Sequence, residues 1–186
     1  MKLFNKLKNL NSEKYSEHSN KDDLATEIAN QLFPELGIGK ASFIVDGDPD
    51  NINNLLVPLS MKGDMLLAEG KMDEAMDCFK KVEKICREHD NKDFLSSSLG
   101  NQSLILLKQN DLDGAMELLI EKEQCCREIN KISGLVPCIF NQGYILYLKN
   151  QVDKGLDRMK EATNIALECG STDLYRKYTN LYKKFK

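Results

Sequence analysis

The chain has 186 residues, of which 41% are hydrophobic and 30% are charged, and it contains no tryptophan. This composition is typical of one folded domain with or without a short appendage, and it excludes collagen-like and low-complexity chains. The 26 lysines and arginines against 29 aspartates and glutamates give a net charge of −3, so no overall positive field favours nucleic acid as a partner. No apolar run approaches the ~18 residues of a membrane-spanning helix, and we therefore expect no stable membrane insertion.

Residues 1–50 are expected to form an N-terminal appendage outside the rest of the fold. The first residues predict a short amphipathic helix that lacks the apolar core of a signal peptide. A polar linker follows, and residues 24–33 then have the spacing of a helix that ends at Pro34. Aspartates alternate in residues 46–50 as in a calcium loop. However, Asn51 and Val57 stand where such a loop needs glycine and glutamate, so we expect a turn.

Few residues of the chain could supply chemistry. The six cysteines form no C-x-x-C pair, and there are only two histidines, so we expect no metal site and reduced, mostly buried thiols in a cytoplasmic protein. The sequence contains neither a phosphate-binding loop nor the motif of a nucleophile elbow. We therefore expect a protein that is not an enzyme and has no cofactor.

Residues 51–186 contain an internal repeat with a period of 40 residues. The segment that begins at Gly70 recurs in register at Asn110 and again at Asn150. The same shift aligns Leu59 with Leu99 and Ile139. Three copies in phase are hard to obtain by chance, so the repeat defines the organisation of this part of the chain.

Each copy of the repeat predicts two helices. The apolar residues of both segments recur at helical spacing. Gly70, Asn110 and Asn150 are expected in the turn between the helices, because these residues tolerate the left-handed conformation of a C-terminal cap. Small residues are expected where the two helices of a pair approach closely, at Ala75, Ala115 and Gly155.

Residues 171–186 predict a further helix that covers the end of the array. Ser171 or Thr172 is the expected N-cap, with Asp173 in the first turn. The basic residues of this segment are expected to face solvent. The apolar stripe expected to pack on the last repeat consists of Leu174, Tyr175, Tyr178, Leu181, Tyr182 and Phe185.

These features resemble the tetratricopeptide repeat, in the extended form of about 40 residues found in kinesin light chains and bacterial arrays. The small residues Gly63, Ser103 and Gly143 match the family's helix-pair contacts, and the resemblance covers residues 53–186. It implies an all-α fold, an α-solenoid of three helix pairs. The expected repeats are about 56–95, 96–135 and 136–170, with a capping helix at 171–186.

The resemblance also implies a function, that of a protein–protein interaction scaffold with a peptide or partner protein in its concave groove. Asn101 and Asn141 match the asparagine that hydrogen-bonds the ligand backbone, a task that suits an amide because it both donates and accepts. Their alternative role is to satisfy neighbouring backbone groups. The other expected binding residues are Leu104, Leu107, Lys108, Phe140, Tyr144 and Tyr147.

Two alternatives stay open from the sequence. Phe140, Tyr144 and Tyr147 lie on one helical face, which could equally pack against the capping helix or the N-terminal segment. The array could also be a structural or self-associating module whose groove is occupied by its own residues 24–45. A homo-oligomer is the corresponding partner alternative, and the sequence does not identify a protein partner.

Overall fold

The computed structural model describes residues 51–186, so the predictions for residues 1–50 lie outside the described part of the chain. The chain divides into two compact units, Met1–Leu59 and Ser60–Lys186. Of the first unit, only residues 51–59 are described, and they include the beginning of the first described helix. The packing below is that of the second unit, and the predicted domain boundary at residue 50 stays a prediction.

The described residues are almost entirely α-helical, and neither a strand nor a bridge occurs among them. None of these helices is long and apolar enough to cross a membrane. Their bounds are α3 (Asn53–Ala68), α4 (Met72–Glu88), α5 (Lys92–Lys108), α6 (Leu112–Glu128), α7 (Ile132–Leu148), α8 (Val152–Glu168) and α9 (Thr172–Tyr182).

The helices end in the same way at intervals of 20 residues. A residue with positive φ follows each helix from α3 to α8, and the next backbone N–H then bonds back into the last turn, as from Asp111 to the Leu106 carbonyl at 2.9 Å. This is the arrangement of a Schellman cap, which satisfies carbonyls that the helix leaves unpaired. The predicted turns at Gly70, Asn110 and Asn150 are confirmed. Within residues 51–186 the positive-φ residues are Gly70, Asp90, Asn110, Asn130, Asn150 and Gly170.

Within a helix pair, small residues allow close approach, as predicted. A β-carbon on Gly143 would lie 2.7 Å from the carbonyl oxygen of Gly155, and one on Gly155 would meet the Gly143 carbonyl at the same distance. Ala115 is fully buried at the equivalent place in the preceding pair. A larger side chain at Gly143 or Gly155 would therefore force α7 and α8 apart.

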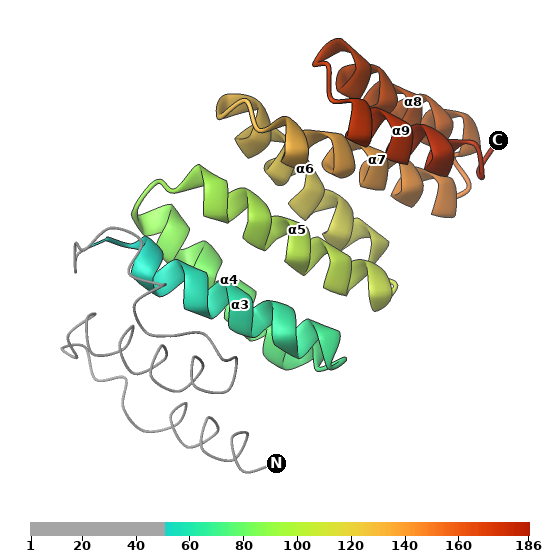
Figure 1. The fold of residues 1–186 in the computed structure, drawn as a ribbon. Helices are drawn as coiled ribbons and strands as arrows, with labels where there is room; N and C mark the ends of the chain where they lie inside the picture. Colours follow the sequence, from blue (N-terminus) through green and yellow to red (C-terminus); the bar gives the residue numbers. More distant parts are fainter. Residues whose placement is uncertain (1–50) are drawn as a thin grey trace. The chain divides into compact units, whose positions relative to one another are not determined.

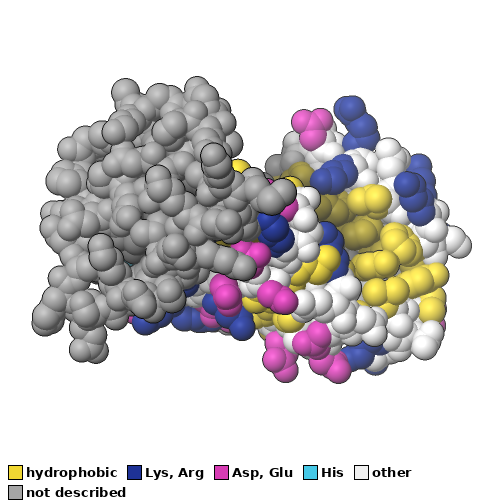
Figure 2. Space-filling view, turned by 90° about the horizontal axis from the view of Figure 1, so that it is seen from below, with side chains coloured by type: hydrophobic (Ala, Val, Ile, Leu, Met, Phe, Trp, Pro, Cys, Tyr) yellow, Lys and Arg dark blue, Asp and Glu magenta, His cyan; other side chains and the backbone are white. Residues whose placement is uncertain are grey.

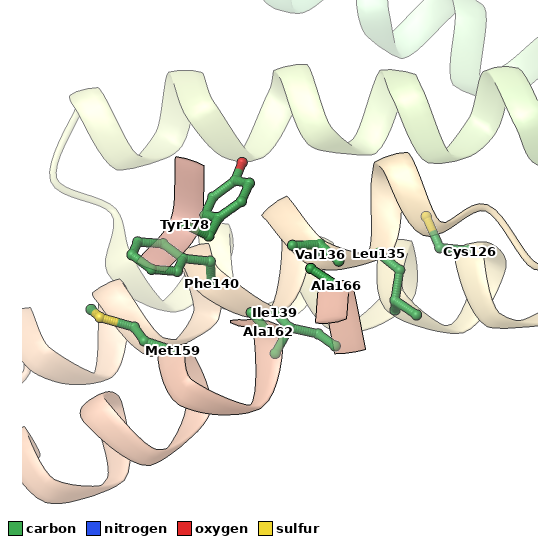
Figure 3. Close-up of a cluster of buried hydrophobic side chains, with 9 residues drawn as sticks. All are labelled: Cys126, Leu135, Val136, Ile139, Phe140, Met159, Ala162, Ala166 and Tyr178. Carbon is green, nitrogen blue, oxygen red and sulfur yellow. The ribbon is translucent and has the colours of Figure 1, made fainter. Parts of the chain in front are cut away.

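The helices pack in chain order as antiparallel neighbours (Figure 1). Helix α9 packs on α8 and also contacts α7, so it covers the end of the array as expected. Tyr178 of α9 joins the buried cluster that α7 and α8 form around Ile139 and Met159 (Figure 3). Tyr175, expected in the same stripe, is instead exposed. An all-α array of helix pairs with a capping helix is thus confirmed.

Adjacent repeats are joined by a hydrogen-bond pattern that recurs with the 40-residue period. Gln102 Nε2 donates to Glu83 Oε2 at 2.6 Å, and Gln142 Nε2 donates to Glu123 Oε2 at 2.9 Å. Both glutamines are buried, so these bonds satisfy amides that would otherwise be costly inside the protein. They fix the second helix of one pair against the first helix of the next.

Candidate partner-binding site

Asn101 is the predicted site residue whose surroundings are most polar. It lies in the middle of α5 and is partly buried. Its Nδ2 donates to Asp64 Oδ1 at 2.9 Å. Burial raises the pKa of Asp64, and the bond from Asn101 opposes that rise only in part. The amide of Asn101 thus bonds a side chain of the preceding pair, and its oxygen is available to accept.

Asn141 occupies the equivalent place on α7 but has a different neighbour. The residue that corresponds to Asp64 in this repeat is Leu104, which cannot accept a hydrogen bond. Among the described residues no hydrogen bond joins the Asn141 side chain to another group. This amide is partly buried, and neither its donor nor its acceptor is used by the described residues.

The other predicted residues of α5 differ in exposure. Leu104 is 38% exposed, and Lys108 is exposed in the last turn of the helix. Leu107 is partly buried because it packs on the apolar cluster around Leu119 and Ile145. Asn101, Leu104 and Lys108 are spaced three and four residues apart, so they share one face of α5.

The predicted aromatic stripe of α7 contacts the C-terminal segment. Phe140 is only 4% exposed, and its ring centroid lies 4.9 Å from that of Tyr178 (Figure 3). The rings of Tyr144 and Tyr147 lie 5.5 and 5.4 Å from the ring of Phe185. The alternative considered for the stripe, packing against the capping segment, is therefore what the described contacts show. Both tyrosines are partly buried, so Phe185 covers part of the surface that they could offer to a partner.

A polar pocket of about 240 Å³ lies beside Asn101, between α5, α6 and the beginning of α7. Lys131 reaches across it, with Nζ 2.7 Å from Asp93 Oδ1 and 3.2 Å from Ser97 Oγ. The hydroxyl of Ser97 itself donates to the Asp93 carbonyl. The lining residues are Ser96, Ser97, Asn101, Lys122, Lys131, Ser133 and Gly134.

Lys122 was not predicted as a site residue, yet its ammonium is the unusual group of this pocket. It is partly buried, and among residues 51–186 it has neither an ion pair nor a hydrogen bond. Burial lowers the pKa of Lys122, and the nearby Lys131 lowers it further. The repeat register could have revealed this residue, because Val82 and Ala162 occupy the equivalent positions.

The described residues offer little for catalysis or metal binding. No group of histidine, cysteine, aspartate and glutamate side chains in residues 51–186 could hold a metal ion. Burial raises the pKa of the Cys86 and Cys138 thiols to about 12, so both stay protonated at neutral pH. Figure 2 shows hydrophobic side chains gathered among charged ones on one face of the described helices, which is typical of an interaction surface.

Comparison with solved structures places this arrangement among repeat proteins. BtubC (BKLC) from P. vanneervenii matches with a TM-score of 0.57 and 15% identity, over 86% of this chain and 70% of that one. The "kinesin light chain nearly identical TPR-like repeats" of Podosopora anserina match with a TM-score of 0.55 and 11% identity, over 87% of this chain and 86% of that one. The fold is that of tetratricopeptide-like (TPR-like) repeats.

A third solved structure with a similar fold is named as a phosphatase. Aspartyl phosphate phosphatase F from Bacillus subtilis matches with a TM-score of 0.69 and 13% identity, over 90% of this chain but only 46% of that one. At this identity the likeness concerns the fold alone. No protein-family model matches the sequence, and no curated protein does. The TPR-like assignment thus rests on the repeat and on the structure.

Proposed function

We propose that this chain is a cytoplasmic, non-catalytic interaction scaffold, and that a peptide or partner protein binds along the first helices of its pairs, α5 and α7. The observation that carries the proposal is the Asn141 amide, which no described group satisfies. Asn101, one repeat earlier, offers an acceptor beside the polar pocket. Two amides at equivalent places in successive repeats suit a ligand with an extended backbone, whose N–H and C=O groups recur regularly.

The exposed residues around these amides supply a surface of mixed character. Leu104 is exposed one turn from Asn101, and Lys108 follows it on the same face. We assign Leu107 a supporting place, because it packs partly on the core beneath. Tyr144 and Tyr147 join the surface when Phe185 is displaced, whereas the buried Phe140 supports it from below.

The test begins with peptides selected by phage display on the full chain. The best peptide is then titrated calorimetrically against the wild type and the double variant Asn101→Ala/Asn141→Ala. Loss of two hydrogen bonds should weaken binding by ~1–3 kcal/mol. Gln124→Ala, which removes an exposed amide on α6, is the matched control and should leave the affinity unchanged.

Two results would count against this site. Equal affinity of the double variant and the wild type would remove the two asparagines from it. A large gain of affinity on deletion of residues 1–50 would instead favour the alternative, in which the chain's own N-terminal segment occupies the groove. Light scattering on the same samples would detect self-association directly.

A further inference from the structure

Lys122 stands at a position that is part of the apolar core in both neighbouring repeats. Val82, 40 residues earlier, is 1% exposed, and Ala162, 40 residues later, is fully buried. A lysine side chain is longer than either, and its charged end needs water or a partner. The second repeat must therefore provide an outlet, that is, a space through which the Lys122 ammonium reaches water or a partner. The first and third repeats need no such space.

Gly100 on α5 provides this outlet. A β-carbon on Gly100 would lie 2.2 Å from Lys122 Nζ, so the ammonium occupies the space that a side chain would take. In the next repeat the equivalent residue is Phe140, whose buried ring packs in the cluster with Ala162. The second repeat thus has its small residue on the first helix and its large residue on the second, and the third repeat has the reverse. As a result, a cation lies where the third repeat has an aromatic ring.

Two further substitutions make the same place hollow and polar. Gly134 lines the pocket where the repeat register has Phe94 and Leu174. Ser96 also lines it, where Leu56 and Val136 are fully buried in the other repeats. At the junction of α5, α6 and the start of α7, a larger or more apolar residue is therefore replaced at three positions, by Lys122, Ser96 and Gly134. The pocket is a local feature of the second repeat and not a general consequence of the fold.

The charges around the pocket are not balanced by the described residues. Lys131 is paired with Asp93, but the ammonium of Lys122 has neither a carboxylate nor a hydrogen-bond acceptor among residues 51–186. A partly desolvated charge without a counterion is costly, and an anion that entered the pocket would remove part of this cost. The other lining groups are hydroxyls, the Asn101 amide and the backbone at the start of α7.

The start of α7 lacks a negative charge that five of the other six described helices carry; α3 lacks it as well. An aspartate occupies the same place in the first turn of five helices, but Ser133 occupies it in α7. These residues stabilise the positive end of each helix. The aspartates are Asp73, Asp93, Asp113, Asp153 and Asp173. The missing carboxylate would belong at the rim of the pocket, because Ser133 lines it.

We propose that this pocket binds one carboxylate of a peptide ligand, held between Lys122 Nζ and the Ser133 hydroxyl. The inference deepens the proposed function and rests on it, since it assigns an acidic group to the ligand that lies against α5 and α7. The carboxylate belongs to an aspartate or glutamate side chain or to the C-terminus of the peptide. A monoanion fits better than a phosphate dianion, because the pocket has one uncompensated cation and the nearby Asp93 would repel further negative charge.

The test uses small carboxylates, so that its outcome does not depend on a selected peptide. The full chain, labelled with ¹⁵N, is titrated at constant ionic strength with N-acetylglutamic acid α-amide, N-acetylglycine and inorganic phosphate, with chloride as the balancing salt. A carboxylate should shift the amide signals of Ser97, Asn101, Ser133 and Gly134 saturably, in the millimolar range. The glutamate derivative reports a side-chain carboxylate, and N-acetylglycine reports a C-terminal one.

Three variants decide whether the site is the one proposed. Lys122→Met should weaken carboxylate binding about tenfold or more, because a charge-assisted bond is lost. Gly100→Ala keeps the lysine but fills its outlet, and it should weaken binding too. Lys84→Met, which removes an exposed lysine of α4 away from the proposed site, should leave binding unchanged. The amide spectrum of each variant shows whether it is folded.

Several results would overturn the proposal. It fails if no carboxylate gives saturable shifts, if binding persists in folded Lys122→Met, or if only phosphate binds. Failure of the proposed function looks different, because selected peptides would then ignore Asn101→Ala/Asn141→Ala while the small carboxylates still bind wild-type protein at Lys122.

Discussion

Lys122 Nζ occupies the space in front of Gly100, where a β-carbon would lie only 2.2 Å away. This relationship joins α6 to α5 without a hydrogen bond or an ion pair from the lysine to any described residue. At the two equivalent positions the third repeat has the buried apolar residues Phe140 and Ala162, and the first repeat has the buried Val82 in place of the lysine. The second repeat therefore has less apolar packing here and places a cation at a polar pocket. This arrangement lowers the stability of the fold unless the cation binds something.

The first prediction concerns the stability of Lys122→Met. Without ligand and at neutral pH, the free energy of unfolding of the variant should exceed that of the wild type by on the order of 1 kcal/mol. The reason is that an uncompensated charge is replaced by an apolar side chain. Urea unfolding measures this difference. A loss of stability would mean that the ammonium is stabilised by an interaction that the described residues do not contain.

The second prediction is the pH dependence of that difference. Burial lowers the pKa of Lys122 below 10.5, so the unfolded chain binds more protons between the two values and wild-type stability rises with pH there. The charged group that faces Lys122 from the N-cap of α7 is Lys131, itself paired with Asp93 of α5, and the thiols of Cys126 and Cys138 lie nearby. The advantage of Lys122→Met should shrink as the pH approaches 10.5. If the stability advantage of Lys122→Met grew with pH, the lowered pKa of Lys122 would be contradicted.

The third prediction compares two glycine-to-alanine changes. Gly143→Ala should destabilise the protein by about 2 kcal/mol, because its new methyl group meets the backbone of α8 at 2.7 Å. Gly100→Ala should change stability little or raise it by up to ~1 kcal/mol, since it meets only the flexible end of Lys122 and alanine favours the helix. Equal thermal stabilities of the two variants would contradict the close approach of α7 and α8.

The fourth prediction concerns the hydrogen bonds between repeats. Gln142 is buried, and its Nε2 donates to the Leu119 carbonyl at 3.0 Å as well as to Glu123. Gln142→Ala should cost ~1–3 kcal/mol, because it removes these two bonds of a buried amide together with the one that its Oε1 accepts from Arg158 Nε at 3.0 Å. Gln124→Ala removes an amide that bonds only the exposed Glu128, and it should stay within ±0.5 kcal/mol. A similar cost for both variants would show that burial is not the cause.

The fifth prediction separates the two roles considered for the aromatic residues of α7. Phe185→Ala should destabilise the capping segment by ~1–2 kcal/mol and speed amide exchange in α9, because Phe185 contacts both Tyr144 and Tyr147. If the two tyrosines bind a peptide, the variant should also bind it more tightly. Tyr175→Ala, at an exposed position of α9, is the control. Unchanged peptide affinity would leave the tyrosines a purely structural role.

Much of the fold could be predicted because every copy of the repeat contains the same pattern of apolar, small and turn residues. The 40-residue register aligned the apolar positions and found the turns at Gly70, Asn110 and Asn150. It missed the equivalent ends of the second helices, such as Asn130, although the aspartate in the first turn of most helices already indicates a 20-residue unit. The expected repeat boundaries near residues 56 and 96 fall a few residues inside α3 and α5, which begin at Asn53 and Lys92.

The candidate site was harder to predict, for a physical reason. Helical spacing places Phe140, Tyr144 and Tyr147 on one face but does not say what covers that face, which depends on where α9 and Phe185 pack. Lys122 could not be predicted as a site residue, because a lone lysine on a helix is usually solvated. Only the comparison with Val82 and Ala162 shows that it interrupts a core position.

The central claim, that a partner lies against the first helices of the pairs, is tested most directly by photo-cross-linking. A photoreactive residue is placed either at Leu104, 38% exposed on α5, or at Ile120, 57% exposed on α6 of the same pair, and each protein is irradiated with the selected peptide. We predict cross-links from position 104 that excess unlabelled peptide suppresses, and none above background from position 120. Cross-links from position 120 alone would contradict the account.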